Sequence, residues 1–367
     1  MRVFHVTPEQ FVELGDALPE QLPATGYLWI GSARREFEVG VPALQAALQR
    51  WTGGQLVDLH VADLLNNQLP SHYDYTSWYD VMVFRRLAAS GNSGNLFVDD
   101  QHGTLAGAKR ALESIDTSPV GFAIFDRVLL TVHPTDCQVR EYFAQRLQQA
   151  GQGGESRSGS TRMPASPADL MLRMVNHMVD SYLELRRLLT RHLGYLQQEL
   201  FRPRGHFSDW NALLDARNAL HALEDTCEDQ RSAITEWIDA LDEWPDETDP
   251  TAQRERELLR VRSRDVLEHI ERVLGHVRRL ESSAESAVQM HFSAQSNRTN
   301  DIMRTLTVIT AIFMPLNLIT GFFGMNFDFL PLVHTSTGVW VTTLLMGLVA
   351  IGLVVVFRRK RYLDRGR

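Results

Sequence analysis

The chain has 367 residues, of which 45 are acidic and 37 are Lys or Arg, and its formal net charge is −8. This length suffices for a large globular domain with its own core, and the acidic balance argues against a nucleic-acid-binding protein. Two cysteines, Cys137 and Cys227, lie far apart and form no metal or redox motif. We interpret them as inert thiols in a reducing compartment.

Residues 1–150 are predicted to form a mixed α/β cytoplasmic domain. Short β-rich runs at 26–31 and 78–84 and a hairpin over 120–132 alternate with helical spacing at 41–51 and 58–69. The chain has no Gly-rich phosphate loop, no zinc-protease motif and no nucleophile elbow. We therefore expect a domain without catalysis, and the protein is not expected to be an enzyme.

The middle of the chain is predicted to be helical. Residues 151–165 are rich in Gly and Ser and are expected to form a linker or loop. Residues 166–250 have the pattern of a helical hairpin region, with helices over 167–199 and 208–241 and a break at 201–205.

From residue 251 a single stalk helix is predicted to run to residue 300 and on into the membrane. Its apolar positions recur every seven residues, as in a coiled coil. The repeating positions are Leu259, Val266, Val273, Leu280, Ala287 and Ala294, with Ser263, Ile270, Val277 and Ala284 four residues after the first four. We expect a helix of this length to pack this seam on copies of itself.

Two segments are apolar enough to cross a bilayer. Residues 301–324 carry a membrane helix over 302–323 with the single charge Arg304, and the helix over 339–357 has none. Each has about the 20 residues that a bilayer requires. The loop 325–338 joins them in a hairpin.

Charge fixes the expected topology. The tail 358–367 has six basic residues and one acid, so its net charge is +5 and the remainder of the chain has −13. Basic residues beside a span hold that end in the cytoplasm, and with two spans the N-terminal part lies on the same side. An acidic cytoplasmic body is compatible with divalent cations as partners.

Polar and small residues of the first span follow one helical face. They are separated by steps of three and four, at Asn300, Met303, Thr307, Thr310, Met314, Asn317, Gly321 and Gly324. This polar stripe is either a packing face between membrane helices or the lining of a pore formed by several copies. Continuity with a self-associating stalk favours the pore.

The stripe also indicates how an ion would pass. It has no carboxylate, and Mg²⁺ gives up its water reluctantly, so a neutral polar lining suits a largely hydrated ion. Rings of Met303, Leu306 and Met314 are expected to close such a path by excluding water.

The loop between the spans carries a recognisable motif. Gly324-Met325-Asn326, flanked as FFGMNFDFLP, resembles the signature of the CorA family of divalent-cation channels. The resemblance extends back through 299–306 and 312–316 and forward to 358–360. It implies a funnel-shaped homopentamer in the plasma membrane (the bacterial inner membrane), with an α+β cytoplasmic domain followed by long helices and two C-terminal transmembrane helices.

The resemblance also assigns roles to residues. Gly324, Met325 and Asn326 would form the selectivity filter at the outer mouth, where Asn326 oxygens and Gly324 carbonyls hold the ion through its water shell. Asn300 and the polar stripe map onto the family's pore-lining positions. Position 317 is Asn where Thr is common, and Asp328 is the only carboxylate of the loop.

Magnesium-selective members of the family are also held shut by Mg²⁺ bound between cytoplasmic subunits. Residues 264–269 resemble the segment that supplies one regulatory carboxylate, which we assign to Asp265. Its partner acid is expected just after the strand ending near 84–87, but this chain has Ala88, Ala89 and Ser90 there.

Three functions are therefore considered. The first is a passive Mg²⁺ channel driven by the membrane potential. The second is a Zn²⁺ transporter of the ZntB-like branch, with or without proton coupling; Met325 counts against it, and His334 with the weakened acid sites counts for it. The third is a membrane-anchored coiled-coil scaffold, which explains the stalk but not the polar stripe.

Overall fold

The computed structural model describes residues 1–89, 115–135, 138–151, 162–200, 210–244, 249–325 and 336–359. These residues form two compact units, Met1–Glu285 and Ser286–Arg367. Cys137, Asn326, Asp328, His334 and the tail beyond residue 359 lie outside the described residues. Each unit is considered by itself.

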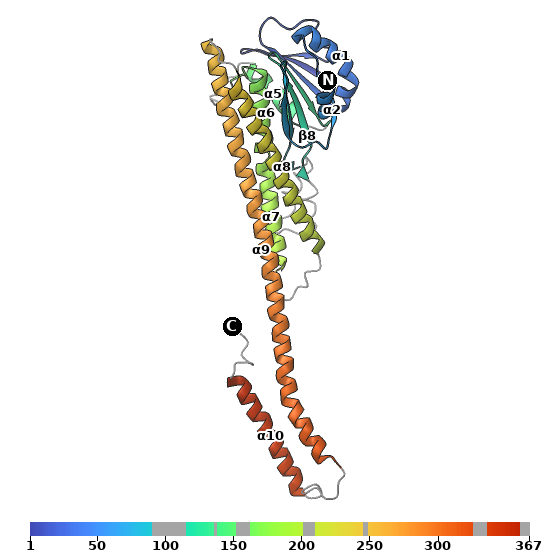
Figure 1. Cartoon of the computed structure of the whole chain (residues 1–367), viewed down its shortest axis with the longest axis vertical. Coiled ribbons are helices and arrows are strands. Elements are labelled where there is room, and N and C mark those ends of the chain that lie inside the picture. The colour runs from blue at the N-terminus through green and yellow to red at the C-terminus, as the bar shows by residue number, and fades with distance from the viewer. Residues whose placement is uncertain are drawn as a thin grey trace. The chain divides into compact units, whose positions relative to one another are not determined.

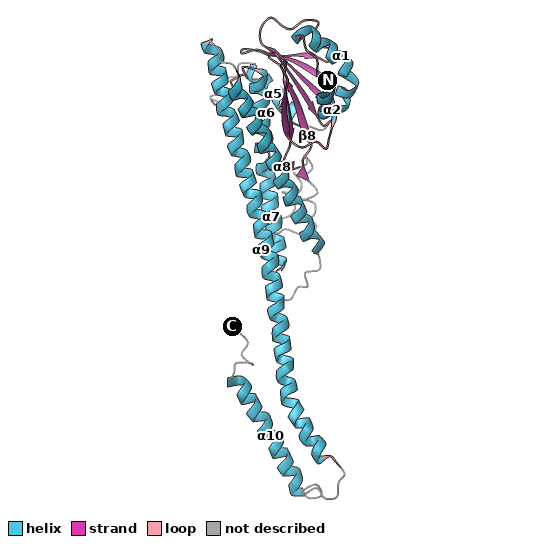
Figure 2. Ribbon diagram, in the orientation of Figure 1, coloured by secondary structure: helices cyan, strands magenta, loops and turns pink. Residues whose placement is uncertain are grey.

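The first unit is built on a seven-stranded sheet (Figures 1 and 2). Its strands, in spatial order, are β2 (Phe11–Gly15), β1 (Arg2–Val6), β3 (Tyr27–Ala33), β9 (Val128–His133), β8 (Pro119–Ile124), β5 (Asp80–Arg85) and β4 (His72–Tyr75). β3 and β9 run parallel, and the other described neighbours run antiparallel. A separate two-stranded sheet pairs β6 (Ala88–Ala89) with β7 (Ile115–Asp116).

The sheet separates two apolar cores because successive side chains of a strand point to opposite faces. On β3, Trp29 belongs to one core, whereas Leu28 and Ile30 belong to the other. Helices α1 (Arg34–Thr52) and α2 (Asp58–Leu65) cover the second face. Helices α5 (Gln138–Gly151) and α6 (Pro167–Asp180) cover the first (Figure 1).

The helix expected over 167–199 is two helices in the structure. α6 begins at Pro167, where the Ser166 hydroxyl accepts a hydrogen bond from the Asp169 backbone N–H, an N-cap. It ends at Ser181, whose hydroxyl hydrogen-bonds to the Met178 and Leu87 carbonyls, and α7 follows over Tyr182–Leu200. The sequence has no Gly or Pro at this break, so its pattern did not reveal it.

Two longer helices follow, α8 (Trp210–Glu243) and α9 (Pro250–Phe323). At 1.5 Å per residue, the 74 residues of α9 rise by about 110 Å. Cys227 on α8 is buried, and burial raises the pKa of its thiol to about 12, as expected for an inert thiol.

The seam of α9 is covered differently from our expectation. Leu259, Val266, Ile270 and Val277 are at most 5% exposed in the single chain, within the core that α6, α7 and α8 share. The polar seam position Ser263 is buried as well, and its hydroxyl accepts a hydrogen bond from the Trp237 indole of α8 at 2.9 Å. The inference that this part of the seam packs on copies of the chain is therefore wrong.

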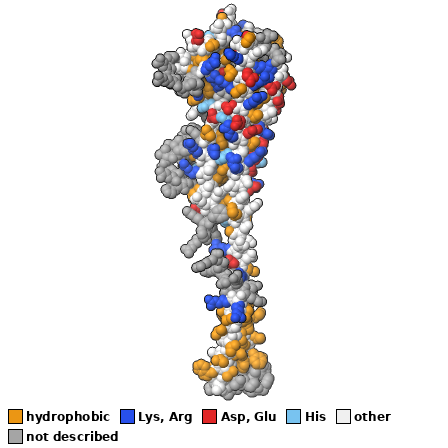
Figure 3. Space-filling model, turned by 90° about the vertical axis from the view of Figure 1, so that its left-hand side faces the viewer, with side chains coloured by type: hydrophobic (Ala, Val, Ile, Leu, Met, Phe, Trp, Pro, Cys, Tyr) orange, Lys and Arg blue, Asp and Glu red, His pale blue; other side chains and the backbone are white. Residues whose placement is uncertain are grey.

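The second unit contains the end of α9 and helix α10 (Ser336–Arg359). Both α9 and α10 include a stretch long and apolar enough to cross a membrane, with mean hydropathies of 1.9 and 2.5. Hydrophobic side chains gather on this unit, whereas charged ones crowd the first unit (Figure 3).

The predicted fold class is confirmed: an α+β domain is followed by long helices and two C-terminal apolar helices. The finer division into eight segments and the homopentamer stay predictions.

Candidate functional site

The polar stripe of the first span is exposed in the single chain, as are apolar residues on other faces of α9 such as Ile309, Phe313 and Leu318. The side chains at all the pore-lining positions expected from the sequence are exposed in the single chain. These positions are Asn300, Met303, Leu306, Thr307, Thr310, Met314, Asn317 and Gly321.

A different face of the same helix is covered. Val308 is only 3% exposed, and Ile312, Pro315 and Ile319 are half-buried. Their spacing of three and four residues places them on one face, roughly 140° around the helix from the centre of the stripe.

Helix α10 has a matching covered face. Gly338 is buried, and Thr342, Met346 and Leu353 are half-buried at helical spacing. α10 is the other described helix of this unit, and it runs beside the end of α9 (Figure 1). The covered positions of each helix lie on one face, and none of the stripe positions is among the covered positions of α9.

Two hydroxyl groups of the stripe have a defined orientation. Thr307 donates to the Met303 carbonyl at 2.8 Å and Thr310 to the Leu306 carbonyl at 2.9 Å. Because each hydroxyl donates its proton inside the helix, each exposed oxygen keeps its two lone pairs as hydrogen-bond acceptors. The stripe therefore presents acceptors, which suit a cation or the water bound to it.

The motif begins where α9 ends. The Gly324 N–H donates to the Thr320 carbonyl at 2.9 Å, and the Met325 N–H donates to the Phe322 carbonyl at 3.4 Å. A Cβ on Gly324 would lie 2.9 Å from the Thr320 oxygen, closer than real side chains come. The backbone can therefore approach Thr320 this closely because residue 324 is a glycine. Asn326, the last residue of the motif, lies outside the described residues.

Asp265 lies in a cluster that our sequence reasoning missed. It is exposed, and the His269 Nε2 is 3.7 Å from its carboxylate. The His269 Nδ1 is 3.2 Å from the carboxylate of Asp180 on α6. The i, i+4 spacing of Asp265 and His269 was visible in the sequence, but the approach of Asp180 required the fold.

An acid also lies near the position where the partner of Asp265 was expected. Strand β6 pairs Ala88 with Asp116 of β7, which brings a carboxylate to this point of the fold. Asp116 forms an ion pair with Arg86 and accepts a hydrogen bond from the Ser118 N–H at 2.9 Å. The negative charge of Asp116 is therefore already balanced by Arg86. Ser90 lies outside the described residues.

Comparison with known proteins shows the family and the fold of the chain. The family described as "CorA-like Mg2+ transporter protein" matches residues 97–359. Among curated relatives, the cobalt/magnesium transport protein CorA of Thermotoga maritima is 27% identical over 195 residues, covering 53% of this chain and 52% of the relative. The magnesium transport protein CorA of Haemophilus influenzae is 30% identical over 150 residues, covering 41% and 46%. The chain thus spans about half the length of the curated relatives it matches.

Solved structures show the same fold along the whole chain. The CorA magnesium transporter of Methanocaldococcus jannaschii matches with a TM-score of 0.69 at 17% identity, covering 98% of this chain and 97% of that one. The full-length CmaX protein matches with a TM-score of 0.59 at 20% identity, with the same coverage. With the family pattern matching residues 97–359, the chain belongs to the CorA-like Mg²⁺ transporter family.

Proposed function

We propose that the protein is a homopentameric channel that passes hydrated divalent cations, foremost Mg²⁺, across the bacterial plasma membrane into the cytoplasm. The observation that carries this proposal is the exposed stripe of acceptors on α9, on a face that α10 leaves uncovered.

The polar side chains of the stripe favour association of several copies of the chain in the membrane. Hydroxyl and amide groups facing hydrocarbon are costly unless they face protein or water. In a single chain Asn317, Thr307 and Thr310 are exposed, so in a bilayer they would face lipid. Assembly of several α9 helices with the stripe inward surrounds these groups with water. The resemblance of the GMN motif to the CorA signature implies five copies, with α10 on the outside.

The lining sets the hydration of the ion. A bare Mg²⁺ prefers anionic oxygens, and the stripe from Asn300 to Gly321 has none. Thr oxygens and Asn amides instead hydrogen-bond to the water shell. Met303, Leu306 and Met314 form the apolar rings of the same path, and dewetting at these rings closes it.

The filter is assigned to Gly324, Met325 and Asn326. Gly324 directly follows Phe323, the last residue of α9, and its N–H donates to the Thr320 carbonyl. Rings of this carbonyl and of the Asn326 amide oxygen would hold the hydrated ion at the outer mouth. Uptake needs no other energy source, because a potential of 100 mV contributes roughly 2.3 kcal/mol per charge, or about 4.6 kcal/mol for a dication.

Regulation by cytoplasmic Mg²⁺ is assigned to the cluster around Asp265. The carboxylates of Asp265 and Asp180 flank His269, and the side chain of Asp265 is 55% exposed and able to meet a neighbouring subunit. The carboxylate at Asp116 is held by Arg86, which weakens it as the second ligand.

The second candidate function is Zn²⁺ transport, with or without proton coupling. It is favoured by His269, because an imidazole between two carboxylates suits Zn²⁺ better than Mg²⁺. Met325 and the acceptor lining of the stripe favour Mg²⁺. His334 and Asp328 in the loop are proposed to attract the cation without selecting between the two ions.

Flux into proteoliposomes separates these functions. The purified chain is reconstituted and uptake of Mg²⁺ and of Zn²⁺ is followed with and without a proton gradient, with Asn326→Ala as control. Potential-driven Mg²⁺ flux that the variant loses supports the channel. Zn²⁺ flux that requires a proton gradient supports the Zn²⁺ transporter. If neither ion is transported, the result supports the membrane-anchored scaffold.

A further inference from the structure

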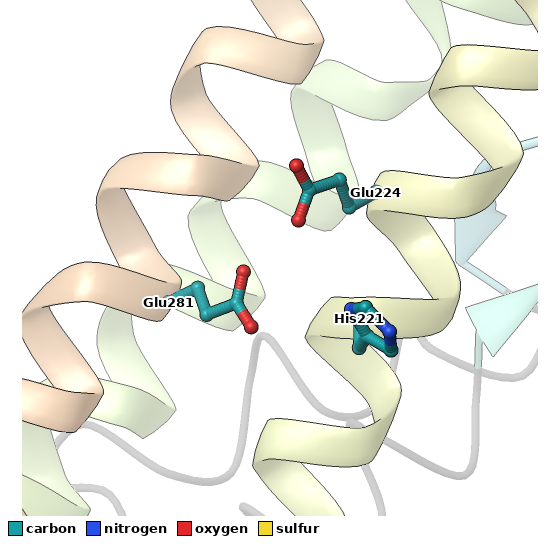
Figure 4. A group of neighbouring side chains, drawn as sticks. All are labelled: His221, Glu224 and Glu281. Carbon is teal, nitrogen blue, oxygen red and sulfur yellow. The ribbon is translucent and has the colours of Figure 1, made fainter.

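A group of metal-ligating side chains lies between α8 and α9, away from the pore and from Asp265. His221 and Glu224 come from α8 and Glu281 comes from α9 (Figure 4). One ligand atom of each lies within 4.8 Å of the others, and all three belong to the unit Met1–Glu285.

Helix geometry explains why the group forms. His221 and Glu224 are three residues apart, so both project from the same face of α8. α9 presents Glu281 to that face, as Figure 4 shows. Metal sites of helical bundles likewise combine a Glu and a His three residues apart on one helix with carboxylates from facing helices, although there the Glu precedes the His.

The carboxylates of Glu224 and Glu281 lie close enough to repel each other when no cation is bound. The pKa of Glu281 is raised, first because burial disfavours its charged form and then because it hydrogen-bonds to the neighbouring Glu224. The pKa of Glu224 is lowered, chiefly because it accepts a hydrogen bond from Arg278.

Arg278 neutralises only part of this charge. Its Nε lies 2.7 Å from one oxygen of Glu224, and its other contact is an ion pair with Glu228. No described ion pair includes Glu281. His221 is exposed, which allows its ring to turn and offer either nitrogen. The second oxygen of Glu224 has no described contact with Arg278, so the group offers two carboxylates and one imidazole to a ligand.

We propose that His221, Glu224 and Glu281 form a binding site for a transition-metal dication, Zn²⁺ or Co²⁺, that bridges α8 and α9 within one subunit. One imidazole nitrogen with two carboxylate oxygens is a donor set that these ions accept at about 2.0–2.2 Å, with water completing the shell. Mg²⁺ favours oxygen ligands and keeps its water, so it competes poorly for the imidazole.

The site is separate from the proposed regulatory cluster. Glu281 lies 16 residues beyond Asp265 on α9, a rise of roughly 24 Å. It uses residues of a single chain and does not depend on the pore or on the ion that the pore passes. Occupancy joins α9 to α8 by metal–ligand bonds.

The test measures metal binding by the purified full-length protein in detergent. After removal of metals, Zn²⁺ is titrated in the presence of excess Mg²⁺, and Co²⁺ binding is followed by its visible absorption. Wild type is compared with His221→Ala, Glu281→Gln and His221→Cys. The matched control is Glu271→Gln, which removes an exposed carboxylate from the same helix.

The expected result is that one tight Zn²⁺ equivalent per chain, which Mg²⁺ does not displace, depends on His221 and Glu281, whereas any Zn²⁺ bound around His269 is the same in wild type and in these variants. His221→Ala and Glu281→Gln weaken binding of the tight equivalent roughly tenfold or more, since the loss of a metal-supporting residue typically has effects of this size. His221→Cys retains it, because a thiolate is a good zinc ligand, and Glu271→Gln leaves it unchanged. Equal Zn²⁺ binding by wild type, His221→Ala and Glu281→Gln would overturn the proposal, as would full displacement by Mg²⁺.

Discussion

The orientation of the stripe can be tested with two neighbouring residues, a Thr and a Val. Their side chains differ only in that Thr has a hydroxyl group where Val has a methyl group. Thr307 lies on the exposed stripe, and Val308 is 3% exposed on the covered face. Thr307→Val and Val308→Thr exchange the two groups at nearly constant volume. If the stripe lines the pore, the first change affects conduction and the second affects packing.

The expected magnitudes follow from the contacts. Thr307 offers one acceptor to the hydration shell, and a hydrogen bond of this kind contributes about 0.5–1.5 kcal/mol. If two of five copies contact the ion at once, Thr307→Val raises the barrier by about 2 kcal/mol, or roughly 30-fold in flux. In Val308→Thr the new hydroxyl can bond within its own helix, so its cost is about 1 kcal/mol of stability with near-normal flux.

The assay combines Mg²⁺ flux into proteoliposomes with thermal stability of the detergent-solubilised oligomer. Thr307→Val is expected to keep the oligomer and its melting temperature while conducting poorly. Val308→Thr is expected to conduct while melting earlier. Normal flux for Thr307→Val together with blocked flux for Val308→Thr would refute the assigned orientation.

Three further predictions follow from single residues. Gly324→Ala places a Cβ 2.9 Å from the Thr320 oxygen, so we expect the helix end to shift and Mg²⁺ flux to fall at least tenfold with the oligomer intact; unchanged flux would count against the filter geometry. Burial lowers the pKa of His133 from 6.5 to about 4. Between these two pH values the imidazole is therefore protonated in the unfolded chain and neutral in the folded domain. Stability should therefore fall by about 3 kcal/mol as the pH drops from about 6.5 to about 4, measured by denaturant unfolding, and His133→Leu should flatten this slope. The buried Cys227 thiol, whose pKa is raised to about 12, should resist a maleimide at pH 8 in the folded protein and react after denaturation; labelling at the same rate in both states would contradict its burial.

The periodicity of apolar residues correctly predicted which positions share a face of α9. It did not predict which segments bury that face. The heptad positions of α9 are indeed one apolar face, yet Val266 and Ile270 are covered by helices of the same chain. A repeat in one helix reports that a partner exists, and it carries no information on whether the partner is another copy or a distant segment. The buried Ser263 shows the same limit, because its partner Trp237 lies 26 residues away on α8.

The stripe was predictable because it depends only on the helical period. Thr310 and Asn317 share the exposed face in the structure, as the spacing required. The sequence could not decide between packing and pore, since that choice depends on where α10 lies. Ile312 and Met346 are half-buried and lie outside the stripe. The assignment of the stripe to a pore stays a proposal.

Long-range pairing explains what the sequence left out around Asp265. Asp116 meets Ala88 across a two-stranded sheet, and Asp180 meets His269 from another helix. Neither pair has a short-range signature. The sequence indicated a missing acid after residue 87, whereas in the fold Asp116 pairs with Ala88 and forms an ion pair with Arg86.

The central claim is that the GMN motif and the stripe conduct a hydrated divalent cation. The most direct measurement is Mg²⁺ uptake into proteoliposomes under an inside-negative potential, for wild type and Asn326→Ala at equal oligomer content. We predict potential-dependent Mg²⁺ uptake by wild type and its loss in the variant. Equal uptake by a correctly assembled Asn326→Ala oligomer, or no uptake by wild type, would contradict the account.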